Sequence, residues 1–243
     1  MRVLFLGTGE AFSERANTSI LVNEEVLLDC GFTTLMQLRK ANINLRNIKI
    51  IFISHFHGDH YFGLPALLLA MREENRNEKL LILSPANGKE RIEKILELSY
   101  STSLNNLKFE AECFEISPLI KKLELDSYIF KFSKNAHSIE CLSVVIEDMK
   151  AKKKIAYTSD GIPSKKFVEI AKNSDLLIAE SYAEGFGNHS SILKSAKLAK
   201  EINAKKLALV HIFRKENIDE KLEKAKEIFP EIFIAKDLQE MRI

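Results

Sequence analysis

At 243 residues, with 46% hydrophobic and 29% charged residues, the chain is long enough for one large domain or two small ones with an ordinary buried core. The formal net charge is only +2 at pH 7, because 36 Lys and Arg residues nearly cancel 34 Asp and Glu residues. This balance excludes a strongly basic nucleic-acid binder, and no apolar run approaches the length that crosses a membrane.

The first half of the chain combines short apolar runs with turn residues, which predicts strands joined by short connections. Apolar residues at helical spacing interrupt this pattern three times. The predicted strands cover residues 2–6, 18–22, 26–28, 48–54 and 80–83, and the predicted helices cover residues 34–41, 65–74 and 89–100.

The second half begins with strands and closes as an alternation of helices and strands. Strands are predicted at 107–114, 128–132, 141–146 and 154–157, followed by helices at 163–173, 190–202 and 217–229 that alternate with strands at 176–179, 206–210 and 232–235. No linker or repeat divides the chain, so we predict one α/β domain over residues 1–243. Its expected architecture is a four-layer αββα sandwich, with two sheets packed face to face between helical layers.

The hexapeptide His55–His60, with the sequence HFHGDH, directly follows an apolar and β-branched strand. In an extended loop, residues two apart point the same way, so His55, His57 and Asp59 can converge on one cavity. His60 points elsewhere and can serve a second ion beside the first. Imidazole and carboxylate ligands together suit zinc, with Mn²⁺ and Fe²⁺ as poorer candidates. A chance cluster of structural histidines is the alternative, but an amide or hydroxyl would fill that role more safely.

Three further residues able to bind a metal lie at the ends of predicted strands, where active-site residues usually lie in layered folds. They are His137, Asp160 and His211. Each one alone would more often be a structural hydrogen-bonding group, but the hexapeptide favours the ligand role for all three. The resulting prediction assigns His55, His57 and His137 to one ion, Asp59, His60 and His211 to a second ion, and Asp160 to a bridging position.

These motifs resemble the metallo-β-lactamase superfamily and, within it, the dinuclear branch similar to ribonuclease Z. The resemblance covers nearly the whole chain and rests on seven stretches. They are Leu6–Gly9, Arg15–Ser19, Leu28–Gly31, His55–Pro65, Tyr157–Asp160, Asn188–Ser191 and Leu209–His211. The resemblance implies the αββα fold, and it implies that Asp29 orients a ligand rather than binding a metal itself.

The chain departs from the pattern of that family at three places. The stretch Gly31–Leu35 lacks the family's acidic residue, and the stretch Ala179–Tyr182 keeps Glu180 but lacks the family's histidine. Members that process tRNA commonly carry a long protruding arm between the positions of His137 and Asp160, where this chain has little more than a hairpin. Since affinity for nucleic acid rests mainly on phosphate contacts by Lys and Arg, we expect small phosphodiesters to be better substrates than precursor tRNA.

Two cations held roughly 3.5–4 Å apart lower the pKa of a bridging water and clamp a phosphoryl oxygen, so we expect the hydroxide to attack phosphorus. The leaving oxygen then needs a proton. By the resemblance His189 is not a ligand, and it is our candidate donor, with Glu180 holding its imidazole and raising its pKa. The alternative for His189 is a polar residue that caps the helix starting near Ser190. Asp59, a ligand at the reacting centre, completes the predicted catalytic set.

The sequence thus predicts a metal-dependent hydrolase with two Zn²⁺ ions, most simply a phosphodiesterase or a nuclease similar to ribonuclease Z. A lactone or thioester hydrolase at the same ions is the second hypothesis, and a metal-bound RNA-binding or sensor module without turnover is the third. The complete ligand set disfavours the third. Predicted partners are a phosphodiester substrate, RNA among them, and a second copy of the chain, with no membrane. Three cysteines without ligand spacing indicate reduced thiols and a cytoplasmic location.

Overall fold

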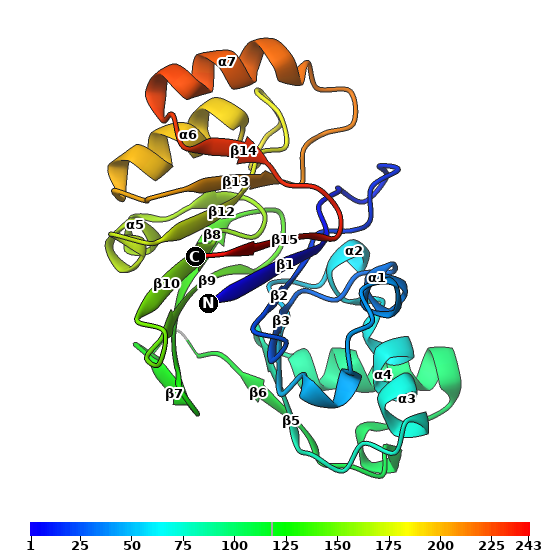
Figure 1. Ribbon diagram of the computed structural model, residues 1–243. Coiled ribbons are helices and arrows are strands. Elements are labelled where there is room, and N and C mark those ends of the chain that lie inside the picture. The colour runs from blue at the N-terminus through cyan, green and yellow to red at the C-terminus, as the bar shows by residue number, and fades with distance from the viewer. Residues whose placement is uncertain (118) are drawn as a thin grey trace.

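Two mixed β-sheets face each other in the computed structural model, which describes residues 1–117 and 119–243. The first sheet has the strand order β15-β1-β2-β3-β4-β5-β6. Its strands are β1 (Arg2–Gly7), β2 (Ser19–Val22), β3 (Val26–Leu28), β4 (Ile50–Phe52), β5 (Leu80–Ser84), β6 (Ala111–Glu115) and β15 (Gln239–Arg242). Because β15 pairs antiparallel with β1, the two chain ends lie side by side (Figure 1).

The second sheet follows the order β11-β8-β9-β10-β12-β13-β14, with β7 paired to β8. Its strands are β7 (Leu123–Leu125), β8 (Tyr128–Ala136), β9 (Cys141–Asp148), β10 (Lys153–Tyr157), β11 (Ile162–Pro163), β12 (Leu176–Glu180), β13 (Leu207–Val210) and β14 (Ile232–Ile234). Strands β10, β12, β13 and β14 run parallel, as the alternation of helices and strands requires.

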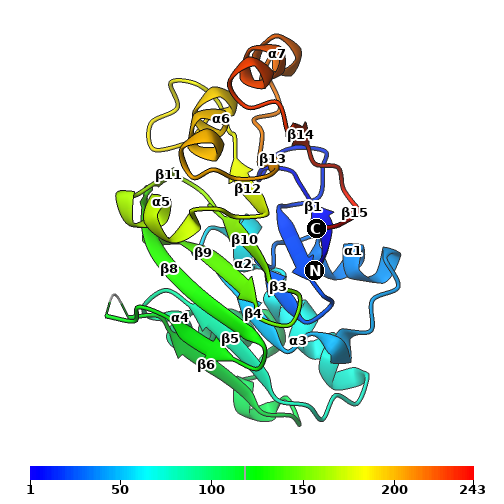
Figure 2. The ribbon, with the colours of Figure 1, turned by 60° about the vertical axis from the view of Figure 1, so that its left-hand side comes forward.

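Helices cover the outer face of each sheet (Figures 1 and 2). The first sheet is covered by α1 (Thr34–Lys40), α3 (Leu64–Glu73) and α4 (Gly88–Tyr100), and the second by α5 (Lys165–Ala171), α6 (Ile192–Glu201) and α7 (Ile218–Ile228). Three short turns complete the helical set, namely α2 (Gly58–Tyr61), η1 (Leu45–Asn47) and η2 (Leu104–Asn106). This arrangement confirms the predicted αββα sandwich. Over the described residues, none of these helices has the length and apolar character that crossing a bilayer requires.

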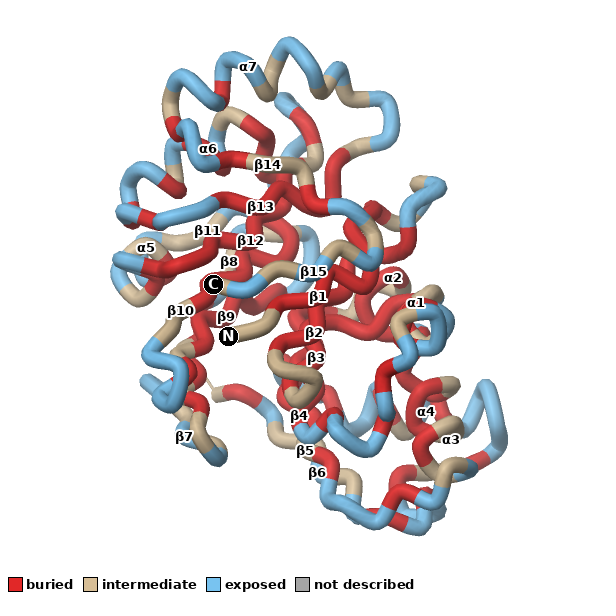
Figure 3. The backbone as a smooth tube through the Cα atoms, viewed as in Figure 1, coloured by how far each residue is buried: buried red, intermediate tan, exposed pale blue. Residues whose placement is uncertain are grey.

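Alternating side chains along the strands build the apolar layers of the sandwich. In β1, Val3 and Phe5 point between the two sheets, whereas Leu4 and Leu6 point toward the covering helices. Phe130 of β8 joins the layer between the sheets from the opposite side. Figure 3 shows the result, with buried strands inside and exposed outer faces on the helices. The strands therefore form a rigid frame, and their ends are well placed to hold reactive side chains.

Most predicted elements agree with the structure to within two residues, and the exceptions have physical causes. The strand predicted to start at residue 107 begins at Ala111, because the chain first turns through η2 and through a left-handed Lys108 (φ 66°). Strand β8 extends four residues beyond its predicted end, to Ala136, since it continues to pair with β9 and β11. The short strands β7, β11 and β15 were not predicted, because each is defined by its partner strand rather than by its own apolar pattern.

One edge of the sandwich collects the carboxyl ends of strands from both sheets. From the first sheet, β3 leads into Asp29 and β4 leads toward His55. From the second sheet, the ends of β8, β10, β12 and β13 carry or precede reactive residues, which are His137, Asp160, Glu180 and His211. The fold thus brings residues that are far apart in the chain to a single edge, as expected for a ligand site in a layered α/β fold.

Candidate metal centre

The loop after β4 changes conformation in the middle of the histidine-rich hexapeptide. The chain is extended at His57 (φ −75°, ψ 144°) and then enters the helical turn α2 at Gly58. The extended loop that we predicted therefore ends at His57, and a helical turn carries Asp59 and His60. A β-carbon at Gly31 would lie 1.9 Å from the carbonyl oxygen of Asp59, so the neighbouring loop reaches this turn only because residue 31 is glycine.

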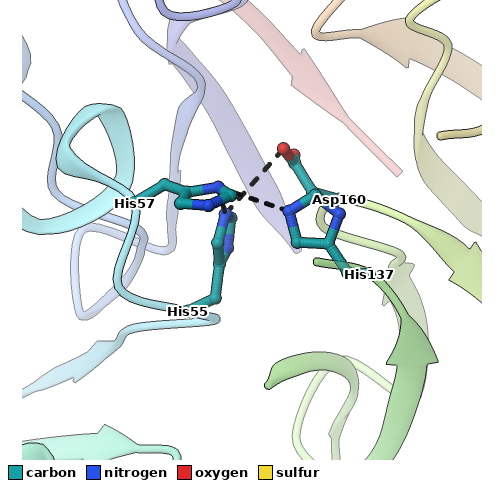
Figure 4. Close-up of side chains that lie close together, drawn as sticks. All are labelled: His55, His57, His137 and Asp160. Carbon is teal, nitrogen blue, oxygen red and sulfur yellow. Dashed lines mark hydrogen bonds and ion pairs between the residues drawn. The ribbon is translucent and has the colours of Figure 1, made fainter. Parts of the chain in front are cut away.

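One group of ligand atoms forms around His55, His57 and His137 (Figure 4). The distance from His55 Nε2 to His57 Nδ1 is 3.1 Å, and the distance from His137 Nε2 to His57 Nδ1 is 3.3 Å. His55 Nε2 also lies 3.9 Å from Asp160 Oδ2. Three imidazoles from two different sheets therefore face one small volume that a carboxylate closes.

A second group lies beside the first and consists of Asp59, His60 and His211. His211 Nε2 lies 3.2 Å from Asp59 Oδ2, and His60 Nε2 lies 3.4 Å from the same oxygen. Asp160 stands between the two groups, with Oδ1 3.4 Å from His60 Nε2 and Oδ2 3.5 Å from His211 Nε2. The structure thus brings together all seven residues that the sequence suggested as ligands, in the grouping that the sequence suggested.

The donor atoms are spaced as ligands of a tetrahedral ion would be. Zinc binds imidazole nitrogen at about 2.0–2.1 Å, so two ligands of one tetrahedral ion lie about 3.3–3.4 Å apart. The distances of 3.1 to 3.4 Å among His55, His57 and His137 and from Asp59 to His60 and His211 match that spacing. The buried His60 Nε2 has no hydrogen-bond partner among the described residues, and a metal ion would bind its lone pair. The residues present therefore fit two metal ions.

The electrostatics of the centre also favour cations. Burial lowers the pKa of His55 well below its usual range and lowers the pKa of His137 to about 4, which keeps both imidazoles in the neutral form that binds metals. Burial acts in the same direction on His60 and His211, but the neighbouring carboxylates, Asp160 foremost, together outweigh it. They raise the pKa of His60 well above its usual range and that of His211 to about 9. Protons on His60 and His211 thus balance the negative charge of the nearby carboxylates, and metal cations can take the place of these protons.

Asp29 supports this centre from behind. Its carboxylate accepts hydrogen bonds from His60 Nδ1 at 2.9 Å, the Tyr157 hydroxyl at 2.7 Å and both the backbone N–H and the hydroxyl of Ser54 at 2.7 and 2.9 Å. All four residues are buried. The carboxylate therefore sets the orientation and tautomer of His60 and leaves Nε2 free to face the centre, in agreement with the supporting role implied for Asp29.

His189 lies at the open side of the centre, next to Asp160. Its Nδ1 contacts Glu180 Oε1, and this hydrogen bond raises the pKa of His189 above its usual value. The second oxygen of Glu180 accepts hydrogen bonds from the backbone N–H groups of Gly161 and Ser190 at 2.7 and 3.1 Å, so the carboxylate cannot rotate away. Ser191, not His189, caps helix α6, which removes the capping role that was the alternative for this histidine.

A cavity of about 380 Å³ opens onto this centre. Its walls combine metal-binding residues with aromatic rings, and it is lined by Glu10, Ala11, Phe12, Phe32, His57, Gly58, Asp59, Asp160, Tyr182, His189 and His211. The Tyr182 ring stacks on the His189 ring, with the centroids 4.6 Å apart. Sequence reasoning identified none of the aromatic residues, because a phenylalanine or tyrosine in a loop carries no signal of where its ring points.

The chain is similar to known protein families and sequences over nearly its whole length. A family model described as "Anti-Pycsar protein Apyc1" matches residues 1–229. Ribonuclease Z from Sulfurisphaera tokodaii is 32% identical over 282 residues, which cover 97% of this chain and 96% of the relative. Because that alignment is longer than the 243 residues of the chain, the relative contains segments that this chain lacks.

Solved structures share the architecture over its whole length. The short form of human tRNase Z superimposes with a TM-score of 0.84 and 26% identity, covering 100% of this chain and 99% of the human one. The metallo-β-lactamase fold protein YhfI from Bacillus subtilis superimposes with a TM-score of 0.82 and 25% identity, covering 99% and 98% of the two chains. The two sheets and their covering helices are therefore a complete copy of this architecture.

Proposed function

Because the chain belongs to the family of metallo-β-lactamase-fold hydrolases that includes ribonuclease Z and Apyc1, we propose that it is a phosphodiesterase acting on RNA-type phosphodiesters at a dinuclear zinc centre. One observation carries this proposal. Asp160 belongs to the group of His55, His57 and His137, its oxygens also lie 3.4 Å from His60 Nε2 and 3.5 Å from His211 Nε2, and the same carboxylate lies beside the Glu180–His189 pair. A bridged pair of cations next to a proton donor suits the hydrolysis of a phosphodiester.

In this proposal each residue of the centre has a defined task. His55, His57 and His137 would hold one ion, Asp59, His60 and His211 would hold the other, and Asp160 would be shared by both sites. When bound, two such ions lower the pKa of a water and neutralise negative charge on phosphoryl oxygens. Asp29 keeps His60 in place through its hydrogen bond to Nδ1. Zinc is the proposed metal, since five imidazoles and two carboxylates form a mixed set of ligands that suits Mn²⁺ and Fe²⁺ less well.

The proton for the leaving oxygen comes from His189 in this proposal. Glu180 holds the Nδ1 side of the ring, so Nε2 is the atom available to the substrate. The raised pKa keeps His189 protonated at neutral pH to a greater extent than an isolated histidine, as a general acid requires. Its side chain is 26% exposed at the cavity, so a leaving group can reach it.

The segment between His137 and Asp160 determines what size of substrate we propose. It consists of β9, a turn and β10, with no protruding arm. Without that arm, and with near-neutral net charge, the protein has few phosphate contacts to offer a folded RNA. We therefore expect clear hydrolysis of a dinucleoside monophosphate and of bis(4-nitrophenyl) phosphate by the zinc-loaded protein, and weak or no site-specific trimming of precursor tRNA.

The test is metal analysis followed by an assay of this protein on both diesters, precursor tRNA, a lactone and a thioester. Efficient, site-specific trimming of precursor tRNA at physiological salt would contradict the size restriction. If the protein hydrolyses a lactone or thioester far faster than any phosphodiester, the atom that it attacks is carbon and not phosphorus. A protein that binds two metal ions but turns over none of these substrates would favour a binding or sensor role.

The hydrogen bonds of Asp29 predict that a substitution at this residue lowers the affinity for metal, although Asp29 is not a proposed ligand. Asp29→Asn removes the charge that orients His60, so we expect the affinity for the second metal ion to fall about 10- to 100-fold. Competition with a chromogenic chelator measures it. Asp175→Asn is the matched control, because this largely buried carboxylate also accepts several hydrogen bonds, from Lys153, Lys205 and the backbone of Lys154, at a place away from the centre. Equal affinities in both variants would contradict the proposed role of Asp29.

A further inference from the structure

Two phenylalanine rings stand exposed at the rim of the catalytic cavity, on loops from different parts of the chain. Phe12 is 75% exposed and Phe32 is 58% exposed, and both line the cavity that contains His57, Asp59 and Asp160. We propose that these rings are stacking platforms for unpaired nucleobases that flank the reacting phosphodiester. The proposal rests on the phosphodiesterase function proposed above and narrows its substrate to single-stranded nucleotides.

Phe12 is held in place by hydrogen bonds and a cation–π contact for which we see no other function. The buried carboxylate of Glu10 accepts a hydrogen bond from the backbone N–H of Phe12 at 2.7 Å and another from Arg214 Nη1 at 2.8 Å. The Arg214 guanidinium lies 5.5 Å from the centroid of the Phe12 ring and 5.2 Å from that of Phe213. A buried acid thus fixes the backbone that carries the exposed ring, and it holds a cation beside that ring at the cavity rim.

Phe32 reaches the rim from the loop after β3. Its ring packs edge-to-face on Phe62 with the centroids 5.7 Å apart. A β-carbon at Gly58 would lie 3.0 Å from Phe32 Cζ and 2.9 Å from Phe62 Cδ2, so both rings lie directly over the metal-binding turn. The close approach at Gly31, the preceding residue, anchors the loop from which Phe32 projects. Phe32 is therefore positioned rather than loosely exposed.

An aromatic ring binds a flat and uncharged group, and here the rings lie next to a polar cavity that binds a charged group. Scattered exposed apolar residues are normal on protein surfaces, but here two rings border one polar cavity built to receive a phosphodiester. Nucleobases attached to that diester bring π-faces to the rim, and aromatic side chains bind such faces without regard to sequence. In a duplex the faces are already stacked on their neighbours, so the platforms favour unpaired bases.

Nucleotide binding with and without a base tests this inference directly. The probes are adenosine 5′-monophosphate and ribose 5-phosphate, titrated calorimetrically into the zinc-loaded protein. They share the phosphate and the sugar and differ in the base. Stacking by alanine substitution typically changes affinity by about 5- to 150-fold per base. We therefore expect the nucleotide to bind at least about 5-fold more tightly than the sugar phosphate.

The variants assign that preference to the rings. The nucleotide carries one base, so the alanine variant that removes the ring on which this base stacks, Phe12→Ala or Phe32→Ala, should reduce the preference about 5-fold or more. Phe12→Tyr and Phe32→Tyr should retain it, and binding of ribose 5-phosphate should stay unchanged in all four variants. Tyr100→Ala is the matched control, because Tyr100 is an aromatic residue of α4 that is 52% exposed and does not line the cavity. Equal affinity for the two probes, or a nucleotide preference that survives both alanine variants, would overturn the proposal.

The binding readout also separates this inference from the proposed function. If the protein hydrolyses no phosphodiester, the proposed function fails, while the preference for the nucleotide still supports the base platforms. If the protein hydrolyses a dinucleoside monophosphate and both alanine variants keep the wild-type KM for it, the platforms are excluded and the phosphodiesterase function stands. An increased KM with nearly unchanged kcat in these variants supports both.

Discussion

Replacing Asp160 with alanine is expected to empty both metal sites together and to reduce kcat/KM on any diester on the order of 10³-fold or more. The wild-type protein should carry about two equivalents of zinc per chain. The physical reason is that the two oxygens of Asp160 reach both groups of ligands, with Oδ2 3.9 Å from His55 Nε2 and Oδ1 3.4 Å from His60 Nε2. The variant loses the ligand that both sites share. It also loses the negative charge that offsets the repulsion between the two cations. Elemental analysis after mild purification measures the occupancy.

The control for this experiment is Asp175→Ala, which removes another largely buried carboxylate from a different edge of the second sheet. Circular dichroism establishes that both variants are folded. One tightly held ion in the native protein, with the same occupancy in Asp160→Ala, would contradict the dinuclear assignment. Loss of metal in the control as well would mean that any damage to the fold empties the sites.

Replacing His189 with alanine is expected to slow the enzyme in a way that depends on the leaving group. General acid catalysis typically contributes ~10²–10⁴-fold, so a diester with a ribose oxygen as leaving group should lose that order of rate. A nitrophenolate leaves without a proton, so bis(4-nitrophenyl) phosphate should lose far less. Since His189 belongs to neither proposed ligand group, metal content should remain that of the wild type.

Glu180→Gln extends the same test. The amide cannot stabilise the charged imidazole as the carboxylate does, but His189 is still present in this variant and can still donate a proton. The loss of rate should therefore again be larger for the ribose leaving group than for nitrophenolate, and milder than in His189→Ala. Equal losses on both substrates in His189→Ala would mean that His189 positions the substrate instead of donating a proton. Loss of metal in His189→Ala would mean that the residue is a ligand, since its Nδ1 partner Glu180 lies within the same group of donor atoms as Asp160.

The sequence alone determined the family and the sandwich, and it named the side chains that we propose as metal ligands. Strands with strong apolar patterns, such as β1 and β9, are local signals, and their boundaries were predicted to within two residues. The hexapeptide His55–His60 is also local, because six adjacent residues contain four groups able to bind metal. With so few histidines in the chain, the strand-end residues His137 and His211 could be added by position and by family resemblance.

Only the tertiary structure decided how these residues meet. The helical turn at Gly58 and the closeness of Gly31 to Asp59 depend on two loops packing together, which no single stretch encodes. Likewise β15 forms only because the end of the chain returns to β1, and its own pattern is too short and too polar to signal a strand. Such features come from contacts between distant segments.

The surroundings of the metal centre show the same division. That Glu180 would hold His189 could be suggested from the sequence, but the removal of the helix-capping alternative required seeing Ser191 at the cap. Phe12 and Phe32 look like ordinary apolar residues in the chain, and burial would be the default expectation for both. Their exposure at one rim arises because Glu10 and Gly31 constrain two separate loops, and side-chain direction in a loop depends on those tertiary contacts rather than on any periodic pattern.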